Sequence, residues 1–103
     1  MVNTPTNRLL TSPGEMLKEE FLNPMGLTAQ ELADGIGVSY QNINELLNNK
    51  RSITVSTALR LAKYFGTTPD FWLNMQRAND IYQALQREGD QIDKIQPIVV
   101  KSI

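Results

Sequence analysis

Signals that begin and end helices recur along this chain, and they constrain its fold more than any other feature. Proline directly follows two of the expected cap residues, and Glu31 stands three residues after Thr28, as in a capping box. Pro24, Gly26 and Gly66 oppose the continuation of a helix. The expected N-cap residues are Ser12, Thr28, Ser39 and Thr68. These signals predict a series of short helices.

Apolar residues repeat at helical spacing between these signals. Ile43, Leu46 and Leu47 recur at intervals of three and four residues and are therefore expected to face inward. The aromatic pair Phe71 and Trp72 is expected to tie the last helix to the core. The sequence predicts an all-α domain of five helices, the last of them ending before GDQID. They are expected at residues 12–22, 27–36, 39–47, 54–66 and 67–88.

Length and composition exclude several kinds of function. A chain of 103 residues buries one core, and its 41% apolar content supports a folded domain. The absence of Cys and His removes disulfides, thiolate metal sites and the common nucleophile–base pairs. We therefore expect no enzyme, no metal and no cofactor. No apolar run is long enough to span a bilayer and no signal peptide is recognisable, so a cytoplasmic protein without a membrane partner is expected.

The two ends of the chain differ from its centre. Residues 1–11 are polar without a clear period and are expected to form a flexible arm, whereas 12–90 should form the folded domain. Residues 91–103 contain the β-branched run IQPIVV and should form a short strand or an extended tail. That tail could pair with a second copy or a partner, or it could fold back on its own subunit, and the pattern leaves both open.

Positive charge gathers in the centre of a chain whose overall net charge is −1. Between residues 38 and 66 the local balance is +3, which leaves −4 for the remainder. The sequence pI of about 5.3 argues against a nucleic-acid partner, but the field at contact range depends on local charges. A basic centre can therefore still dock on phosphates.

The helices expected at residues 27–36 and 39–47 are short and closely linked, as in a helix-turn-helix. Gly35 or Gly37 can supply the turn, and the small Ala33 allows the two helices to cross closely. In this motif the second helix enters the major groove of DNA with its N-terminus first. The pattern favours a DNA-reading second helix over an amide-rich helix that is merely solvated.

Polar side chains are expected along the outer face of that second helix and in the loop behind it. Gln and Asn can pair with adenine, and Glu can accept from the amino group of cytosine. The N–H groups at the start of the helix can bind a phosphate, and the basic loop lies where the DNA backbone would pass. The candidate DNA-binding residues are Thr28, Ser39, Tyr40, Gln41, Asn42, Asn44, Glu45, Asn48, Lys50 and Arg51.

The stretch LTAQELADGIGVSYQNINELLNNKRSIT, with LRLAKYFGTTPDFWLNMQ behind it, resembles the Xre/Cro-type helix-turn-helix regulators. More narrowly, the chain resembles the HigA-type addiction-module antitoxins, also called virulence-associated protein I. The opening pattern of that family matches Pro13, Gly14 and Glu15, and the resemblance covers residues 12 to about 80. Its second signature matches Gly66, Thr67, Pro69, Phe71, Trp72, Leu73 and Gln76.

The resemblance implies a five-helix lambda-repressor-like domain that forms a homodimer and binds double-stranded operator DNA. It also implies that the protein represses its own operon and neutralises a small basic RelE-like toxin, HigB, which cleaves mRNA on ribosomes. By position, the recognition helix would carry Ser39, Tyr40, Gln41, Asn44 and Glu45, and the basic loop Lys50 and Arg51.

The chain departs from this pattern at three positions. Many relatives have Arg in place of Tyr40, a basic or neutral residue in place of Glu45, and Gly in place of Asn49. Fewer cations should lower non-specific affinity, while Asn49 still tolerates a positive φ. Two rival interpretations remain open: a stand-alone transcriptional regulator without a toxin, and a protein-interaction module that has lost DNA binding.

Overall fold

The structure is a computed structural model that describes residues 11–99 of the 103. Over these residues the backbone is all-helical and contains no strand. The first helical segment is continuous over α2 (Pro13–Met16), η1 (Leu17–Leu22) and α3 (Asn23–Met25). It is followed by α4 (Ala29–Ile36), α5 (Tyr40–Leu47), α6 (Val55–Phe65) and α7 (Pro69–Asp93).

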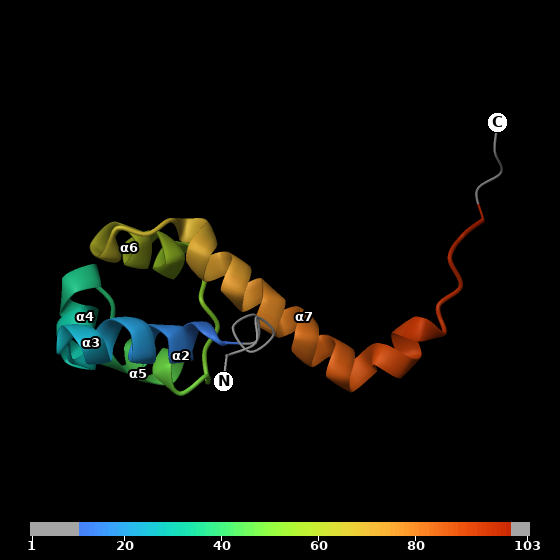
Figure 1. Cartoon of the computed structure of the whole chain (residues 1–103), viewed down its shortest axis with the longest axis horizontal. Helices are drawn as coiled ribbons and strands as arrows, with labels where there is room; N and C mark the ends of the chain where they lie inside the picture. The colour runs from blue at the N-terminus through green and yellow to red at the C-terminus, as the bar shows by residue number, and fades with distance from the viewer. Residues whose placement is uncertain (1–10, 100–103) are drawn as a thin grey trace, which may run out of the picture.

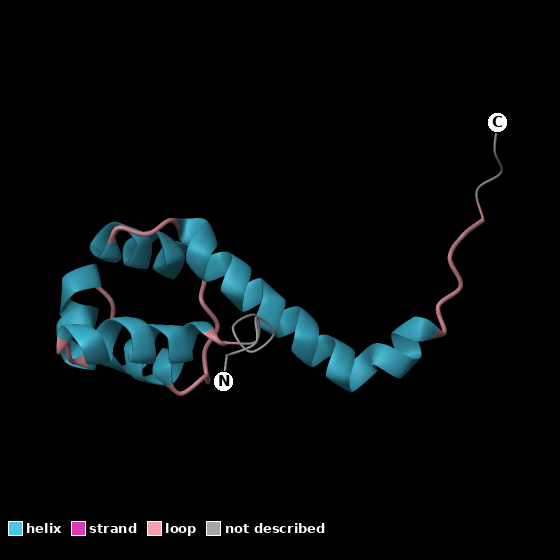
Figure 2. Ribbon diagram, in the orientation of Figure 1, coloured by secondary structure: helices cyan, strands magenta, loops and turns pink. Residues whose placement is uncertain are grey.

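These five helical segments confirm the predicted all-α architecture of five helices. The segments up to α6 gather in one body, and α7 starts on that body and runs out of it (Figure 1, Figure 2). Most of the arm expected at residues 1–11 and the end of the tail lie outside the described residues. None of the helices described is long and apolar enough to cross a membrane.

The first helix is wider in its middle than an α-helix. Leu17–Leu22 is a π-helix, and the N–H of Asn23 donates to the carbonyl of Lys18, five residues back. This geometry brings residues five apart to nearly the same side, so Leu17 and Leu22 are both buried. The break predicted over Pro24 and Gly26 falls at Gly26, which ends the helix in a left-handed conformation with φ 62°. Pro24 does not end it, because the α-helical turn that follows the π-helix places the proline at a first-turn position.

Side-chain caps begin the helices where the sequence predicts them. The Oγ atom of Ser39 accepts from the N–H of Asn42 at 3.0 Å, and Thr28 forms a complete capping box with Glu31. Ser12 and Thr68 cap α2 and α7 in the same way. The remaining cap, Thr54 at the start of α6, was not among the expected cap residues.

Left-handed residues end the helices around the helix-turn-helix. Gly37, with φ 77°, makes the turn between α4 and α5, and the next N–H bonds back to the carbonyl of Ala33 at 3.0 Å. Gly35 lies inside α4, where the ring of Tyr64 covers it. Asn49 takes φ 59° after α5, as the sequence predicts for a residue that replaces glycine.

The core is organised around Trp72, which is fully buried. Its ring lies 5.2 Å from that of Phe21 and 6.3 Å from that of Phe65, measured between centroids, so it joins the π-helix, α6 and α7. The indole N–H donates to Thr67 Oγ1 at 2.8 Å. The structural role predicted for Trp72 is confirmed, whereas Phe71 stands at the edge of this cluster with 37% of its surface exposed.

Helix α7 is longer than predicted and leads into an exposed tail. It passes through Gly89 and ends at Asp93, because one glycine costs a helix only about 1 kcal/mol and no proline follows it there. Of the short strand or extended tail expected at residues 91–103, the strand is absent from residues 95–99, which are solvent-exposed. Ile98 and Val99 are 85% and 87% exposed, so this part of the tail does not fold back on its own subunit.

Replacing Thr67 with valine should destabilise the fold, because the buried indole N–H of Trp72 would lose its acceptor. We expect the free energy of unfolding to fall by about 1–3 kcal/mol, measured by urea denaturation. The control Thr67→Ser keeps the acceptor and should cost less than about 1 kcal/mol. Equal losses in the two variants would contradict this role of the hydrogen bond.

Candidate nucleic-acid interface

Helix α5 turns one face to the core and the other to solvent. Ile43 and Leu46 are buried and Leu47 is half-buried, as predicted. They pack α5 against α4 and against the start of the N-terminal helix. The orientation of the outward face is therefore set by the core, which is what a surface that reads another molecule requires.

The outward face gathers four of the predicted residues, namely Tyr40, Gln41, Asn44 and Asn48, all of which are exposed. Residues four apart lie on the same side of a helix, so these side chains form one strip along α5. The Nδ2 atom of Asn48 donates to the carbonyl of Asn44 at 2.9 Å. The strip is made of amides and one phenol, which can exchange hydrogen bonds with base edges.

The start of α5 presents its backbone to solvent. Ser39 is exposed and its hydroxyl takes the N–H of Asn42, one of the four N–H groups that a helix leaves without helical partners. The first N–H groups of the helix point along its axis beyond Ser39. A phosphate is the anion that such a terminus can bind.

Two other predicted residues do not belong to the strip. Thr28 is exposed at the start of α4, where its hydroxyl is engaged in the capping box with Glu31. Asn42 is half-buried, and its Oδ1 atom is enclosed without a hydrogen-bond partner among the described residues. Among the described residues, the hydrogen bonds of the Thr28 side chain stay within its capping box and join it to no side chain of the strip.

Glu45 is the acidic member of the predicted set, and both of its carboxylate oxygens are engaged. Gln41 Nε2 donates to Oε2 at 3.1 Å, and Arg51 donates to Oε1 from Nη2 at 2.8 Å and from Nε at 3.0 Å. Together, the Gln41 amide and the Arg51 guanidinium hold the pKa of the Glu45 carboxyl below its usual value. Three predicted residues from the helix and the loop are therefore joined by one carboxylate.

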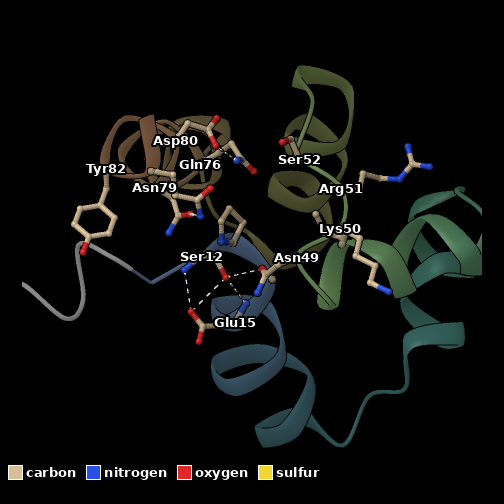
Figure 3. Close-up of a pocket in the computed structure, with 14 residues that line it drawn as sticks. Ser12, Glu15, Asn49, Lys50, Arg51, Ser52, Gln76, Asn79, Asp80 and Tyr82 are labelled. Atoms are coloured by element: carbon tan, nitrogen blue, oxygen red, sulfur yellow. Dashed lines mark hydrogen bonds between the residues drawn. The ribbon is translucent and has the colours of Figure 1, made fainter. Parts of the chain in front are cut away.

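The loop after α5 is tied to the start of the first helix. The Oγ atom of Ser12 donates to Asn49 Oδ1 at 2.8 Å, and a Cβ on Gly14 would lie 2.3 Å from the carbonyl oxygen of Leu46. Figure 3 shows Ser12 and Asn49 meeting beside Glu15, while Lys50 and Arg51 point away from them. A hollow of about 450 Å³ lies at this junction, between α2, the loop and α7.

The cations of the central segment serve different purposes. Arg60 Nη1 donates to the carbonyl of Ile36 at 2.7 Å, which ties α6 to the end of α4. Arg51 is paired with Glu45, and Lys50 is exposed in the loop. The local charge of +3 already subtracts Glu45, so it is the engagement of Arg60 that makes this charge less available to a phosphate backbone than the sequence count indicates.

Neither the junction of Ser12 with Asn49 nor the pairing of Glu45 with Arg51 was predicted. The sequence pattern marks Ser12 only as a cap, and its partner Asn49 lies 37 positions further along the chain, beyond the range of any local pattern. Glu45 and Arg51 are six residues apart, and Arg51 lies beyond the end of α5, so helical spacing does not predict their contact. The spacing of Gln41 and Glu45, four residues apart on one helix, was the available signal.

Comparison with known proteins places this arrangement in a family. Residues 17–72 match the sequence model of the helix-turn-helix family. The chain is 48% identical over 86 residues to virulence-associated protein I of Dichelobacter nodosus, spanning 84% of this chain and 79% of that protein. It is 40% identical over 95 residues to antitoxin HigA-1 of Vibrio cholerae, spanning 92% and 90% of the two chains.

A solved structure extends the likeness to three dimensions. The antitoxin HigA of Pseudomonas aeruginosa, solved with the higBA promoter, superposes with a TM-score of 0.83 at 33% identity and covers 87% of this chain and 99% of that one. The HigA proteins among these relatives are antitoxins. The chain therefore belongs to the Xre-type helix-turn-helix family, among the proteins related to the HigA antitoxins.

Proposed function

We propose that this protein binds operator DNA sequence-specifically through α5 and represses transcription by occupying the operator. The observation that carries the proposal is the exposed strip of Tyr40, Gln41, Asn44 and Asn48, held by the core and preceded by the helix N-terminus at Ser39. In the orientation of a helix-turn-helix, this strip enters the major groove and the loop with Lys50 reaches the DNA backbone. A relative of the same fold was solved with promoter DNA, which supports the proposal.

We propose further that the protein acts as a homodimer joined along α7. Seven residues of this helix lie at alternating spacings of four and three, the pattern of a coiled-coil seam: Phe71, Met75, Ala78, Tyr82, Leu85, Gly89 and Ile92. Leu85 is 52% exposed and Tyr82 is 43% exposed, although large apolar side chains gain from burial. A second copy would cover them and place two recognition helices on two half-sites.

The third element of the proposal is the antitoxin role, in which the protein sequesters a small basic toxin of the RelE/HigB type. The similarity to antitoxin HigA-1 over nine-tenths of the chain supports it. A stand-alone regulator would share the DNA chemistry but lack the partner. The contents of the neighbouring reading frame separate the two roles.

Purified protein should bind its own promoter far more tightly than a scrambled duplex, and affinity for both should fall steeply with salt. The double variant Gln41→Ala, Asn44→Ala should lose at least about tenfold of the promoter preference, since each good bidentate pair contributes about 1–3 kcal/mol. Fluorescence anisotropy across a salt series measures both quantities.

A matched double variant, Asn23→Ala with Gln86→Ala, removes two exposed amides outside α5 and should leave the preference unchanged. Equal, negligible binding of the wild-type protein to both duplexes would contradict DNA reading and favour a protein-interaction module.

Placing a charge in the seam should separate the dimer. Leu85→Glu puts two carboxylates against each other across the two-fold axis, so we expect a monomer by analytical ultracentrifugation and weaker operator binding. The control Gln86→Glu adds the same charge one residue off the seam and should remain dimeric. A wild-type monomer, or a Leu85→Glu dimer of unchanged stability, would contradict the seam.

If the protein encoded next to this gene is the toxin, it should arrest growth when expressed alone, and co-expression with this protein should relieve the arrest. The two proteins should also co-purify. A neighbour that is harmless by itself, or whose arrest persists in the presence of this protein, would contradict the antitoxin role and leave the stand-alone regulator.

A further inference from the structure

Glu45 stands between two residues that face DNA in the proposed function. Its Oε2 atom accepts from the amide of Gln41 on α5, and its Oε1 atom accepts from the guanidinium of Arg51 in the loop. The shortest of these contacts is 2.8 Å. One side chain thus connects a base-facing position with a phosphate-facing position on two different elements.

The contact with Glu45 settles which way the Gln41 amide points. A glutamine amide can present either its oxygen or its nitrogen to a neighbour, but an ionised carboxylate only accepts hydrogen bonds. Glu45 therefore selects the orientation in which the Nε2 atom of Gln41 faces the Glu45 carboxylate. The Oε1 atom and the second N–H then remain for a base, and this pair of groups is what a bidentate contact with adenine needs.

The contact with Arg51 has a different effect. Two of the guanidinium nitrogens, Nε and Nη2, are held against the carboxylate, which fixes the side chain against the end of α5. The remaining N–H groups can still reach a phosphate in one direction. At the same time the negative charge of Glu45 offsets the positive charge of Arg51, so attraction to any DNA backbone is reduced.

We propose that Glu45 is a positioning residue for DNA recognition, which orients the Gln41 amide for an adenine and restrains Arg51, rather than a reader of cytosine. This inference rests on the proposed function. It follows from the fact that each of the two carboxylate oxygens already accepts a hydrogen bond from a protein donor. Glu45 raises selectivity by limiting what its two neighbours can do.

The chain contains a natural control for this arrangement. On α4, Gln30 Nε2 donates to Asp34 Oδ1 at 2.9 Å, with the same four-residue spacing and in an exposed position. Asp34→Asn and Glu45→Gln remove one negative charge each and keep the size of the side chain. The two variants have the same net charge, but only the second lies on α5.

The test measures affinity for the operator, for a scrambled duplex and for a set of operators with single base-pair changes, at several salt concentrations. Glu45→Gln should bind the scrambled duplex more tightly, with a salt slope steeper by about one because Arg51 can engage a further phosphate. Its preference for the operator should fall by at least about tenfold. The fall should be concentrated at the base pair where Gln41→Ala also loses discrimination, and Asp34→Asn should leave the profile unchanged.

Three results would overturn the inference. Glu45→Gln could lose discrimination at a C·G pair at which Gln41→Ala keeps it, and Glu45 would then be a direct reader of cytosine. An equal gain for all duplexes would mean that Glu45 only repels phosphates, and an unchanged profile would remove its role. A wild-type protein without operator preference would instead reject the proposed function itself.

A measurement without DNA separates these failures. In the free protein, the side-chain N–H signals of Gln41 should shift with pH as Glu45 titrates, with a midpoint below the usual glutamate range. Arg51→Ala should raise that midpoint. Because the pKa is lowered by folding, the stabilising contribution of the carboxylate is present at neutral pH and is lost as the pH falls through the lowered value. If the Gln41 signals do not change over this titration, the hydrogen bond between Gln41 and Glu45 does not form in solution.

Discussion

The burial of Trp72 is the interaction on which the rest of the structure depends. It holds the π-helix, α6 and α7 together through Phe21 and Phe65, and its N–H is satisfied by Thr67. The helical segment that contains Phe21 begins at Pro13, and its second residue, Gly14, lies so close to the carbonyl of Leu46 that no side chain fits between them. The position of α5 is thus linked to the aromatic cluster through one continuous helical segment, and the proposed DNA-reading strip takes its direction from the core.

Local chemistry made much of this fold predictable. A cap such as Ser39 and a left-handed residue such as Asn49 act within a few residues of themselves, so their effect can be read from the sequence. The helical pattern of Ile43 and Leu46 was equally local. The features that could not be predicted depend on contacts between residues far apart in the sequence, or on competition between a helix-breaking residue and the helix around it. The contact of Ser12 with Asn49 joins residues that have the whole helix-turn-helix between them.

The errors at the two longest helices have a common cause. Proline and glycine were each expected to end a helix, although each has positions in a helix at which it destabilises the helix only slightly. Pro24 lies in the first turn of the α-helical segment that follows the π-helix, and Gly89 follows the good helix formers of residues 83–88. The candidate site shows the same limit: the residue types were predicted, but the carboxylate that joins Gln41 to Arg51 was not.

The π-helix carries a consequence for how this protein compares with its relatives. In a π-helix each backbone N–H bonds to the carbonyl five residues back, so a turn contains about one residue more than a turn of α-helix. Removing one residue from the exposed segment 18–20 could therefore leave Leu17 and the segment after it on the same side of an ordinary α-helix. Length differences of one residue between related chains would be absorbed here, in the turn that faces solvent, without displacing the aromatic core or the end of α5.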